Sequence, residues 1–240
     1  MPNNWFRFKQ FTIQQEHAAM KVGTDGVLLG AWASVPVAGS TVLDVGTGTG
    51  LIALMIAQRS RDVKMDALEI DPSSAKQARE NFRNSPWNQR LRCIQEAFQN
   101  YASHCKIRYD QLICNPPFFS GSMKSPSKSK NLARHDDSLS LGDLFAGAHT
   151  VIKETALLSL IVPADKQAQV FELISKHEMH SRRLTWVKPT PAKPANRILV
   201  EFSPTPGLCQ EDELIIETEG RHMYSARFKE LVNEFYIDKD

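Results

Sequence analysis

The residues Asn115-Pro116-Pro117-Phe118 place a side-chain amide, a rigid turn and an aromatic ring directly after an apolar run. Two consecutive prolines cannot continue a sheet because neither has an N–H to donate, so the run Tyr109 to Cys114 is predicted to end there as a buried strand. The Asn115 side-chain oxygen and the Pro116 carbonyl can each accept an N–H from an amine, and Phe118 can stack on a base. This combination predicts a clamp for a flat ring that carries an amino group, with these three residues as the catalytic set.

A glycine loop lies upstream, between a predicted strand at 41–45 and a predicted apolar helix at 51–59. It comprises Asp44, Gly46, Gly48 and Gly50. Glycines let a loop turn tightly and let a ligand approach the backbone. The helix N-terminus behind the loop carries a partial positive charge that suits a carboxylate or a pyrophosphate. We therefore expect these four residues to bind a cofactor.

Glu69 ends the next predicted strand, at the spacing of an acid that holds ribose hydroxyls. A mere tight turn with a surface glutamate is the alternative interpretation, but strand, loop, helix and acid in register favour an adenosine-type cofactor. The spacing G-x-G-x-G departs from the dinucleotide pattern G-x-G-x-x-G, which favours a methyl donor over a nicotinamide. The same context favours the clamp over an ordinary strand-ending turn, which Asn and Pro also form.

These residues require a frame of alternating strands and helices, and the chain predicts one from residue 40 onward. Such alternation indicates right-handed crossovers and a mostly parallel sheet covered on both faces. A proline-rich connection at 188–196 leaves no room for a helix, so the strands on either side of it are predicted to form a hairpin. The expected strands are 41–45, 63–69, 91–95, 111–114, 155–162, 182–187, 198–202 and 214–218, and the expected helices are 27–33, 51–59, 71–84, 141–152, 165–176 and 225–235.

Length and composition fit one domain over 1–240, with 42% hydrophobic residues. We expect a segment at 1–36 that covers the cofactor, a core at 37–203 and an extension at 204–240. The four cysteines are scattered without a C-x-x-C pair, which argues against a zinc site or a disulfide framework. No apolar run reaches the length of a membrane span and the start lacks a signal-peptide pattern, so we expect a cytoplasmic protein.

The net charge is only +2, so any nucleic-acid argument depends on where the charges lie. One basic segment follows the clamp and another surrounds the proline-rich connection. We expect both to contact RNA phosphates, although lysines that merely solvate a loop and a hairpin tip are the alternative. The predicted RNA-binding residues are Lys124, Lys128, Lys130, Arg134, Lys188, Lys193 and Arg197.

Taken together, 44–50, Glu69 and 115–118 resemble the class I S-adenosylmethionine-dependent methyltransferases that methylate amino groups. More closely, the chain is similar to the family of bacterial tRNA methyltransferases that modify the exocyclic amine of adenine 37 in valine tRNA. That similarity runs nearly end to end, through 19–33, 84–87 and the closing 235–236. It implies an α/β, Rossmann-like, doubly wound and mostly parallel seven-stranded sheet with an antiparallel C-terminal hairpin. It also implies S-adenosylmethionine as cofactor and tRNA as substrate, and we expect a monomer without a metal site.

The resemblance also implies roles for single residues. The three loop glycines would line the methionine end of the cofactor, Glu69 would take the ribose hydroxyls, and Asn115 would lie against the cofactor as well as the base. The segment 21–26 would close over the cofactor, with Lys21 and Thr24 as its contacts. One departure concerns the acid at the end of the third strand, where this chain has Ala97. Either Glu96 replaces that acid through a small shift, or the backbone around Phe98 binds the cofactor adenine.

Other functions share the same clamp. A protein-glutamine methyltransferase uses an Asn-Pro-Pro turn on a side-chain amide, and a DNA adenine or rRNA guanine methyltransferase would also fit. A non-catalytic RNA-binding module is disfavoured because the glycines, Glu69 and Asn115 are all present. Composition and spacing do not separate these substrates, and only the resemblance selects tRNA.

Overall fold

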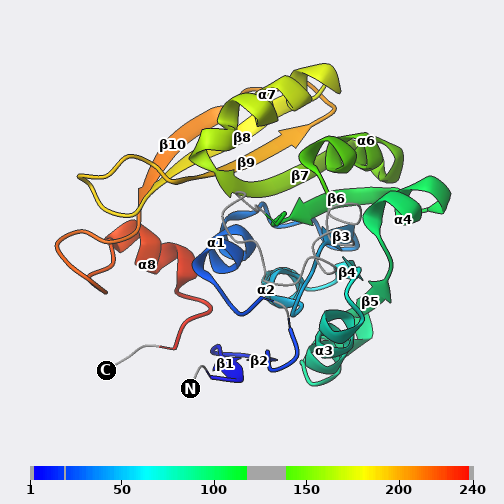
Figure 1. Ribbon diagram of the computed structural model, residues 1–240, viewed down its shortest axis with the longest axis horizontal. Helices are drawn as coiled ribbons and strands as arrows, with labels where there is room; N and C mark the ends of the chain where they lie inside the picture. The colour runs from blue at the N-terminus through cyan, green and yellow to red at the C-terminus, as the bar shows by residue number, and fades with distance from the viewer. Residues whose placement is uncertain (1–2, 19, 118–138, 238–240) are drawn as a thin grey trace, which may run out of the picture.

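A computed structural model describes residues 3–18, 20–117 and 139–237. Within them, an eight-stranded sheet runs in the order β10-β8-β9-β7-β6-β3-β4-β5, with helices against both faces (Figure 1). The five strands from β5 to β7 are parallel, and β9 is antiparallel to both of its neighbours. The predicted doubly wound, mostly parallel α/β fold is therefore confirmed.

The elements follow one another closely along the chain. The strands are β1 (Trp5–Arg7), β2 (Thr12–Gln14), β3 (Thr41–Val45), β4 (Lys64–Glu69), β5 (Leu91–Gln95), β6 (Tyr109–Cys114), β7 (Ile152–Pro163), β8 (His180–Lys188), β9 (Arg197–Ser203) and β10 (Gln210–Ile215). The helices are α1 (Thr24–Trp32), α2 (Leu51–Arg59), α3 (Pro72–Arg83), α4 (Phe98–His104), α6 (Leu141–Val151), α7 (Gln167–Lys176) and α8 (Ala226–Val232), with short 3-10 turns at Asn88–Arg90 and Ala164–Lys166.

The sheet has one strand more than the seven expected. β8 and β9 form the predicted antiparallel hairpin, and β10 then adds to β8 in parallel, with Leu214 opposite Val187. Its sequence, QEDELI, has four exposed residues and one buried one, which is the pattern of an edge strand with little apolar alternation. The sequence therefore indicated a strand near this place but not its membership of the main sheet.

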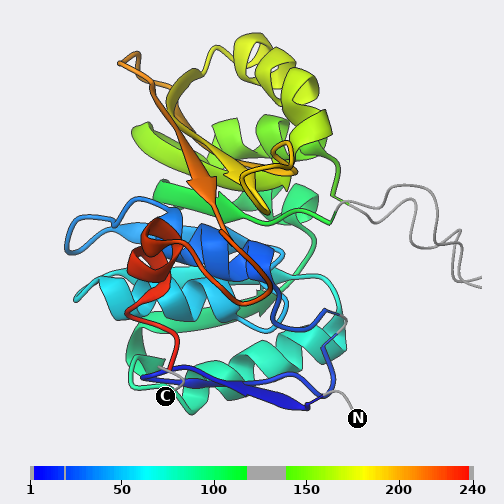
Figure 2. The same cartoon turned by 90° about the vertical axis from the view of Figure 1, so that its left-hand side faces the viewer.

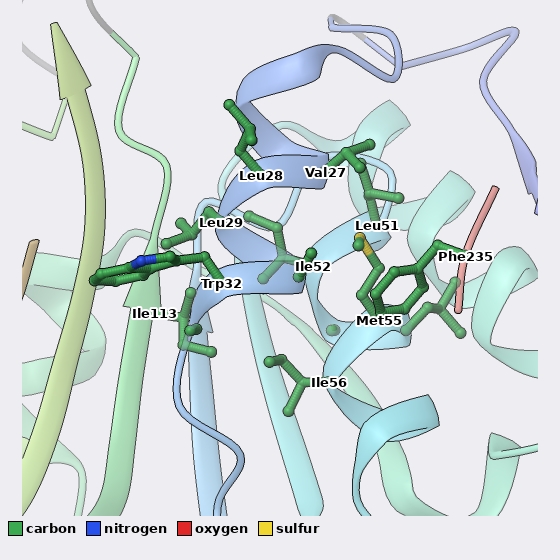
Figure 3. Packing of buried hydrophobic residues seen from close by; sticks show 14 of the residues in the cluster. Val27, Leu28, Leu29, Trp32, Leu51, Ile52, Met55, Ile56, Ile113 and Phe235 are labelled. Atoms are coloured by element: carbon green, nitrogen blue, oxygen red, sulfur yellow. The ribbon is translucent and has the colours of Figure 1, made fainter. Parts of the chain in front are cut away.

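The two faces of the sheet have separate hydrophobic cores. Alternation along β3 directs Val42 into the core under α1 and α2, and Leu43 into the core under α4, α6 and α7. Figure 3 shows the first core, in which α1 lies directly against α2. A Cβ at Gly30 would lie 2.6 Å from the Met55 sulfur, so only glycine permits this close approach of the two helices.

Helix α1 is fixed at its carboxyl end. The Trp32 indole N–H donates to the Thr185 hydroxyl at 2.8 Å, and the Ser34 backbone N–H donates to the Glu201 carboxylate at 3.1 Å. The amino end of α1 lies beside the start of α2, because a Cβ at Gly26 would be 3.1 Å from Leu51. The N-terminal segment is thus joined to the body through a helix of which seven of nine residues are buried.

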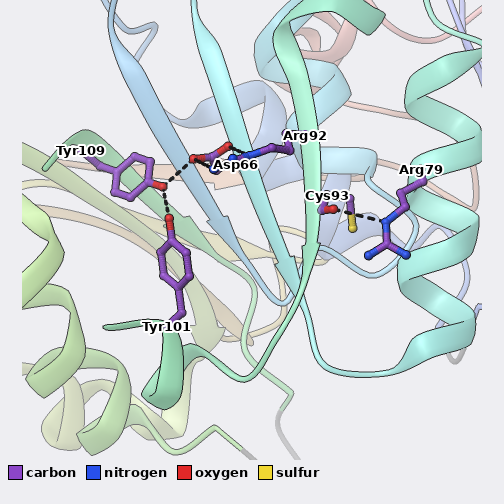
Figure 4. Close-up of polar contacts among 6 residues, drawn as sticks. All are labelled: Asp66, Arg79, Arg92, Cys93, Tyr101 and Tyr109. Atoms are coloured by element: carbon purple, nitrogen blue, oxygen red, sulfur yellow. Dashed lines mark hydrogen bonds and ion pairs between the residues drawn. The ribbon is translucent and has the colours of Figure 1, made fainter. Parts of the chain in front are cut away.

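The sequence did not predict β1, β2 or α4. The two strands have three residues each, too few for an alternating pattern, and they pack beside α3 near both termini (Figure 2). α4 has only seven residues. It is joined to the sheet by a hydroxyl pair, in which Tyr101 meets Tyr109 and Tyr109 donates to Asp66 at 2.6 Å (Figure 4).

No helix among the described residues combines the length and apolar character that crossing a membrane requires.

Candidate active site

Three neighbouring parallel strands end at the same level at the carboxyl edge of the sheet. Val45 of β3 pairs with Leu68 of β4 on one side and with Cys114 of β6 on the other. The residue that follows each of these three is a predicted site residue: Gly46, Glu69 and Asn115. Ligands of open α/β sheets bind at this edge, where strand ends meet. The register therefore brings the loop, the acid and the clamp together.

The glycine loop has the backbone that its sequence predicts. Gly46, Gly48 and Gly50 have φ angles of +72°, +57° and +84°, a region that side chains rarely adopt. A Cβ at Gly46 or Gly48 would meet no atom within 4 Å, so the space over these two residues is open. A Cβ at Gly50 would lie 2.4 Å from the Phe82 ring. The loop thus forms a backbone cradle that rests on α3.

Glu69 is held in place from two directions. Its Oε2 accepts the Gly48 N–H at 2.8 Å and its Oε1 accepts the Asp71 N–H at 2.9 Å, while the residue is 9% exposed. A carboxylate oxygen has two lone pairs, so each oxygen keeps capacity for one further donor. A pair of ribose hydroxyls fits this arrangement.

Asp44 lies behind the loop and is fully buried. Its Oδ2 accepts the Thr47 hydroxyl at 2.6 Å, whereas its Oδ1 has no hydrogen bond of ordinary geometry within the described part of the chain. Burial raises the pKa of the Asp44 carboxyl to about 7, although Thr47 and the Ala53 amide oppose this shift. A buried carboxylate two residues before Gly46 favours a cationic group in a ligand bound at the cradle through its charge.

The clamp residues stand where the sequence places them. Asn115 is half-buried and Pro116 is buried, directly after the last residue of β6. Burial raises the pKa of the preceding Cys114 thiol well above its usual range, which makes that thiol unreactive. Phe118 lies outside the described residues, as do four predicted RNA-binding residues: Lys124, Lys128, Lys130 and Arg134.

Glu96 lies at the correct edge but already has a partner. Its backbone N–H donates to the Glu69 carbonyl at 3.1 Å, which places Glu96 next to the end of β4. Its Oε1, however, is 2.8 Å from Nε2 of His104 on α4. A role for Glu96 in cofactor binding therefore stays a prediction, and it requires the side chain to share or leave this contact.

The remaining predicted residues are exposed to different extents. Lys21 is exposed, with Nζ 3.3 Å from the Asn3 carbonyl oxygen, and Thr24 is the exposed first residue of α1. Lys193 is exposed at the hairpin tip. Two further cations are paired: Lys188 with Glu213 at 2.6 Å and Arg197 with Asp25 at 2.8 Å. Pairs that are partly exposed to water are weak, so both cations remain able to meet a phosphate.

Sequence reasoning missed two residues of α3 that support the site. Phe82 lies beneath Gly50, and the buried Asn81 donates to the Thr49 carbonyl at 2.8 Å. The amphipathic pattern of α3 does not indicate that the Asn81 amide contacts the glycine loop, which lies far away in the sequence.

The residues present fit a cofactor with an amino-acid end and a ribose. The open cradle and the start of α2 suit a carboxylate, Asp44 suits an ammonium group, and Glu69 suits a diol. Within the described ranges there is no cluster of three or more His, Cys, Asp or Glu side chains that could hold a metal ion.

Comparison with known proteins finds a matching family model and relatives that are similar over nearly the whole chain. Residues 22–156 match the model of the methyltransferase small domain. The chain is 44% identical to the tRNA1(Val) (adenine(37)-N6)-methyltransferase of Christiangramia forsetii over 99% of both chains. It is 41% identical to the protein of that name from Flavobacterium psychrophilum, over 97% of this chain and 99% of the other.

Two solved structures have a similar fold. A predicted O-methyltransferase of Agrobacterium tumefaciens gives a TM-score of 0.69 at 18% identity, over 88% of this chain and 96% of that one. A TehB-like SAM-dependent methyltransferase of Corynebacterium glutamicum gives 0.51 at 13% identity, over 76% and 89%. At these identities the likeness concerns the fold alone.

Proposed function

This chain belongs to the family of tRNA1(Val) (adenine(37)-N6)-methyltransferases, and from that premise we propose that it methylates the exocyclic 6-amino group of an adenine in tRNA. We infer that the methyl donor is S-adenosylmethionine and that the target is position 37 of valine tRNA. The observation that carries the proposal is the common level of Gly46, Glu69 and Asn115 at three adjacent strand ends. This common level supports a function in which a cofactor cradle lies directly beside an amine clamp.

The binding roles follow from the geometry. Glu69, already fixed by two backbone N–H groups, accepts the hydroxyls of the cofactor ribose. The N–H groups at the start of α2 hold the carboxylate of the amino-acid end, and Asp44 holds its ammonium group. Lys21 and Thr24 lie on the segment that covers the cofactor. When bound, the cofactor supplies an electrophilic methyl group on a sulfonium.

The clamp makes the target amine available to that methyl group. An aromatic amine is a poor nucleophile because its lone pair is delocalised into the ring. The Asn115 side-chain oxygen and the Pro116 carbonyl each accept one N–H, which favours a pyramidal nitrogen with its lone pair directed at the donor. Alignment of the two reacting groups provides the acceleration, and the chemistry needs no general base with a tuned pKa.

The substrate is a large anion, and its target base is unpaired or flipped out. The base must leave its stack because the clamp lies at the end of a buried strand, where a paired base cannot reach it. Lys188, Lys193 and Arg197 on the β8–β9 hairpin are proposed phosphate contacts, together with the four cations that follow the clamp. We propose that the enzyme acts as a monomer in the cytoplasm, where tRNA is modified.

The test is labelled methyl transfer to bulk tRNA from cells that lack this protein, followed by nucleoside analysis. N6-methyladenosine at position 37 of valine tRNA is the expected product. Label on protein glutamine, on guanosine or on DNA would refute the tRNA proposal and select one of the alternatives. Failure of the intact protein to bind S-adenosylmethionine would indicate a non-catalytic module.

A matched pair of variants tests the clamp. Asn115→Ala should lower kcat by about 100-fold or more, because the amine loses one of its two acceptors in the transition state. Its affinity for S-adenosylmethionine should stay within about threefold. Asn100→Ala, on the exposed face of α4, serves as the control and should behave as the wild type. Near-normal turnover by Asn115→Ala would show that the clamp does not act as described.

A further inference from the structure

We propose that Asn81 of α3 is a positioning residue that fixes the cofactor cover against the glycine loop. The cover is defined as the described part of the chain between β2 and α1, residues 15–18 and 20–23. This inference rests on the proposed function, because it assumes that the cradle binds S-adenosylmethionine.

All hydrogen-bonding groups of the Asn81 side chain are in use. Its Oδ1 accepts the Gln14 N–H at 2.9 Å, and its Nδ2 donates to the Gln14 carbonyl at 2.9 Å. The same Nδ2 donates to the Thr49 carbonyl at 2.8 Å, and the residue is 1% exposed. One amide group therefore joins Gln14, the last residue of β2 and the one directly before the cover, to the glycine loop. Gln14 and Thr49 are far apart in the sequence, and the Asn81 amide connects them.

Two further buried amides hold the cover along its length. The Gln77 Oε1, one helical turn before Asn81, accepts the His17 N–H at 3.4 Å. Within the cover, the Gln15 Oε1 accepts the Val22 N–H at 2.9 Å and its Nε2 donates to the Asn3 carbonyl at 2.9 Å. Gln77 and Gln15 are 3% and 5% exposed. The cover is thus attached mainly by side-chain amides, together with one backbone bond from the Gln15 N–H to the Asn4 carbonyl at 2.8 Å.

The cover runs from β2 to the start of α1, which lies near the proposed cofactor site. Figure 2 shows it rising from β2 to the start of α1 along the edge of the sheet at which β6 ends. α1 begins beside α2, as the contact of Gly26 with Leu51 shows. The cover therefore connects Gln14, which Asn81 anchors, to the helix that begins beside the start of α2, and we infer that its position along this path depends on that anchor.

The same helix also supports the cradle from below. Phe82 lies against Gly50, and Asn81 holds the carbonyl of the residue before it. Neighbouring residues of α3 thus fix the loop and the cover relative to each other. Loss of the Asn81 amide leaves the carbonyls of Gln14 and of the buried Thr49 without this donor, which favours displacement of both segments toward water.

The experiment measures S-adenosylmethionine binding by calorimetry with the full-length chain and kinetics on tRNA. Asn81→Ala should raise the Kd and the KM for S-adenosylmethionine by about tenfold, with kcat at saturating cofactor within about threefold and KM for tRNA unchanged. Asn81→Asp should lose affinity similarly, because a carboxylate keeps the acceptor but has no N–H for the two carbonyls. Trypsin should cleave the variants after Lys21 faster than the wild type, with less protection by the cofactor.

The control is Val170→Ala, a core substitution in α7 away from the cover. It should lower the melting temperature as Asn81→Ala does, yet leave the cofactor Kd unchanged. Equal Kd values for Asn81→Ala and Val170→Ala would overturn the inference and leave the proposed function intact. A wild-type protein that fails to bind S-adenosylmethionine would overturn both.

Discussion

Replacement of Asp44 by Asn tests whether the buried carboxyl is a proton-linked part of the cofactor site. Burial raises the pKa of Asp44 to about 7 in the free protein, so the group is largely neutral at pH 6 and largely ionised at pH 8. A cationic ligand group beside it favours the ionised form, and binding then releases a proton. Asp44→Asn has nearly the shape of the neutral form but never ionises.

The size of the effect follows from that pKa. At pH 6, one unit below that pKa, about one carboxyl in ten is ionised, so the affinity for S-adenosylmethionine should be about tenfold weaker than at pH 8. The free energy of unfolding of the free protein falls as the pH rises, whereas the affinity for the cofactor increases. A pKa that folding raises from 3.8 to about 7 stabilises the protein at low pH, and this contribution, roughly 4 kcal/mol, is lost as the pH rises between these values.

Calorimetry in buffers of different ionisation enthalpy measures both the affinity and the protons released. The wild type should release close to one proton per cofactor near pH 6, whereas Asp44→Asn should bind more weakly with an affinity that no longer depends on pH. Thermal unfolding across the same pH range gives the stability difference between the two proteins. A wild-type affinity that is constant from pH 6 to pH 8, or the same pH dependence in both proteins, would refute the reasoning.

Two further predictions concern the frame around the site. Gly50→Ala should abolish cofactor binding and destabilise the fold by more than about 2 kcal/mol, because it adds a Cβ 2.4 Å from Phe82 to the left-handed strain. Gly39→Ala introduces the same left-handed strain without a contact to a neighbouring side chain, and it should lower the free energy of unfolding by about 1–2 kcal/mol in chemical denaturation. Equal losses of stability in the two variants would show that the contact with Phe82 does not contribute. Tyr109→Phe removes the 2.6 Å bond to Asp66 at the amino edge of the sheet and should cost about 1 kcal/mol, a fall in melting temperature of about 2–4 °C. Its methylation rate should not change, and a reduced rate would contradict the structural role assigned to this bond.

The sequence predicted the site better than its surroundings because the site depends on local backbone chemistry. Glycines at positive φ, a double proline at a strand end and an acid after the next strand each identify their place through neighbours in the chain. Their convergence then follows from the register of parallel strands. This is why Gly46, Glu69 and Asn115 were placed together without any knowledge of side-chain contacts.

Contacts between distant segments could not be predicted in the same way. Nothing in α3 distinguishes Asn81 from a solvated polar residue, because its three partners lie in β2 and in the glycine loop. The strand pairing of β10 could not be predicted for the same reason, since its mainly polar residues lack an alternating pattern. The aromatic ring of Tyr236 packs on Phe8, a contact across almost the whole chain. Such contacts are properties of the folded state alone.

The polar groups of the site divide into those that are proposed to bind the cofactor and those that hold these residues and the glycine loop in position. The Gly48 amide holds Glu69, Thr47 holds Asp44, and Asn81 holds Thr49. Each of these contacts joins groups of the chain itself, so folding contributes to the ordering of the site. Asp44 is the exception, because its Oδ1 has no hydrogen bond of ordinary geometry among the described residues and burial raises its pKa to about 7. We therefore expect most of the pH dependence of cofactor binding to originate at this one carboxyl.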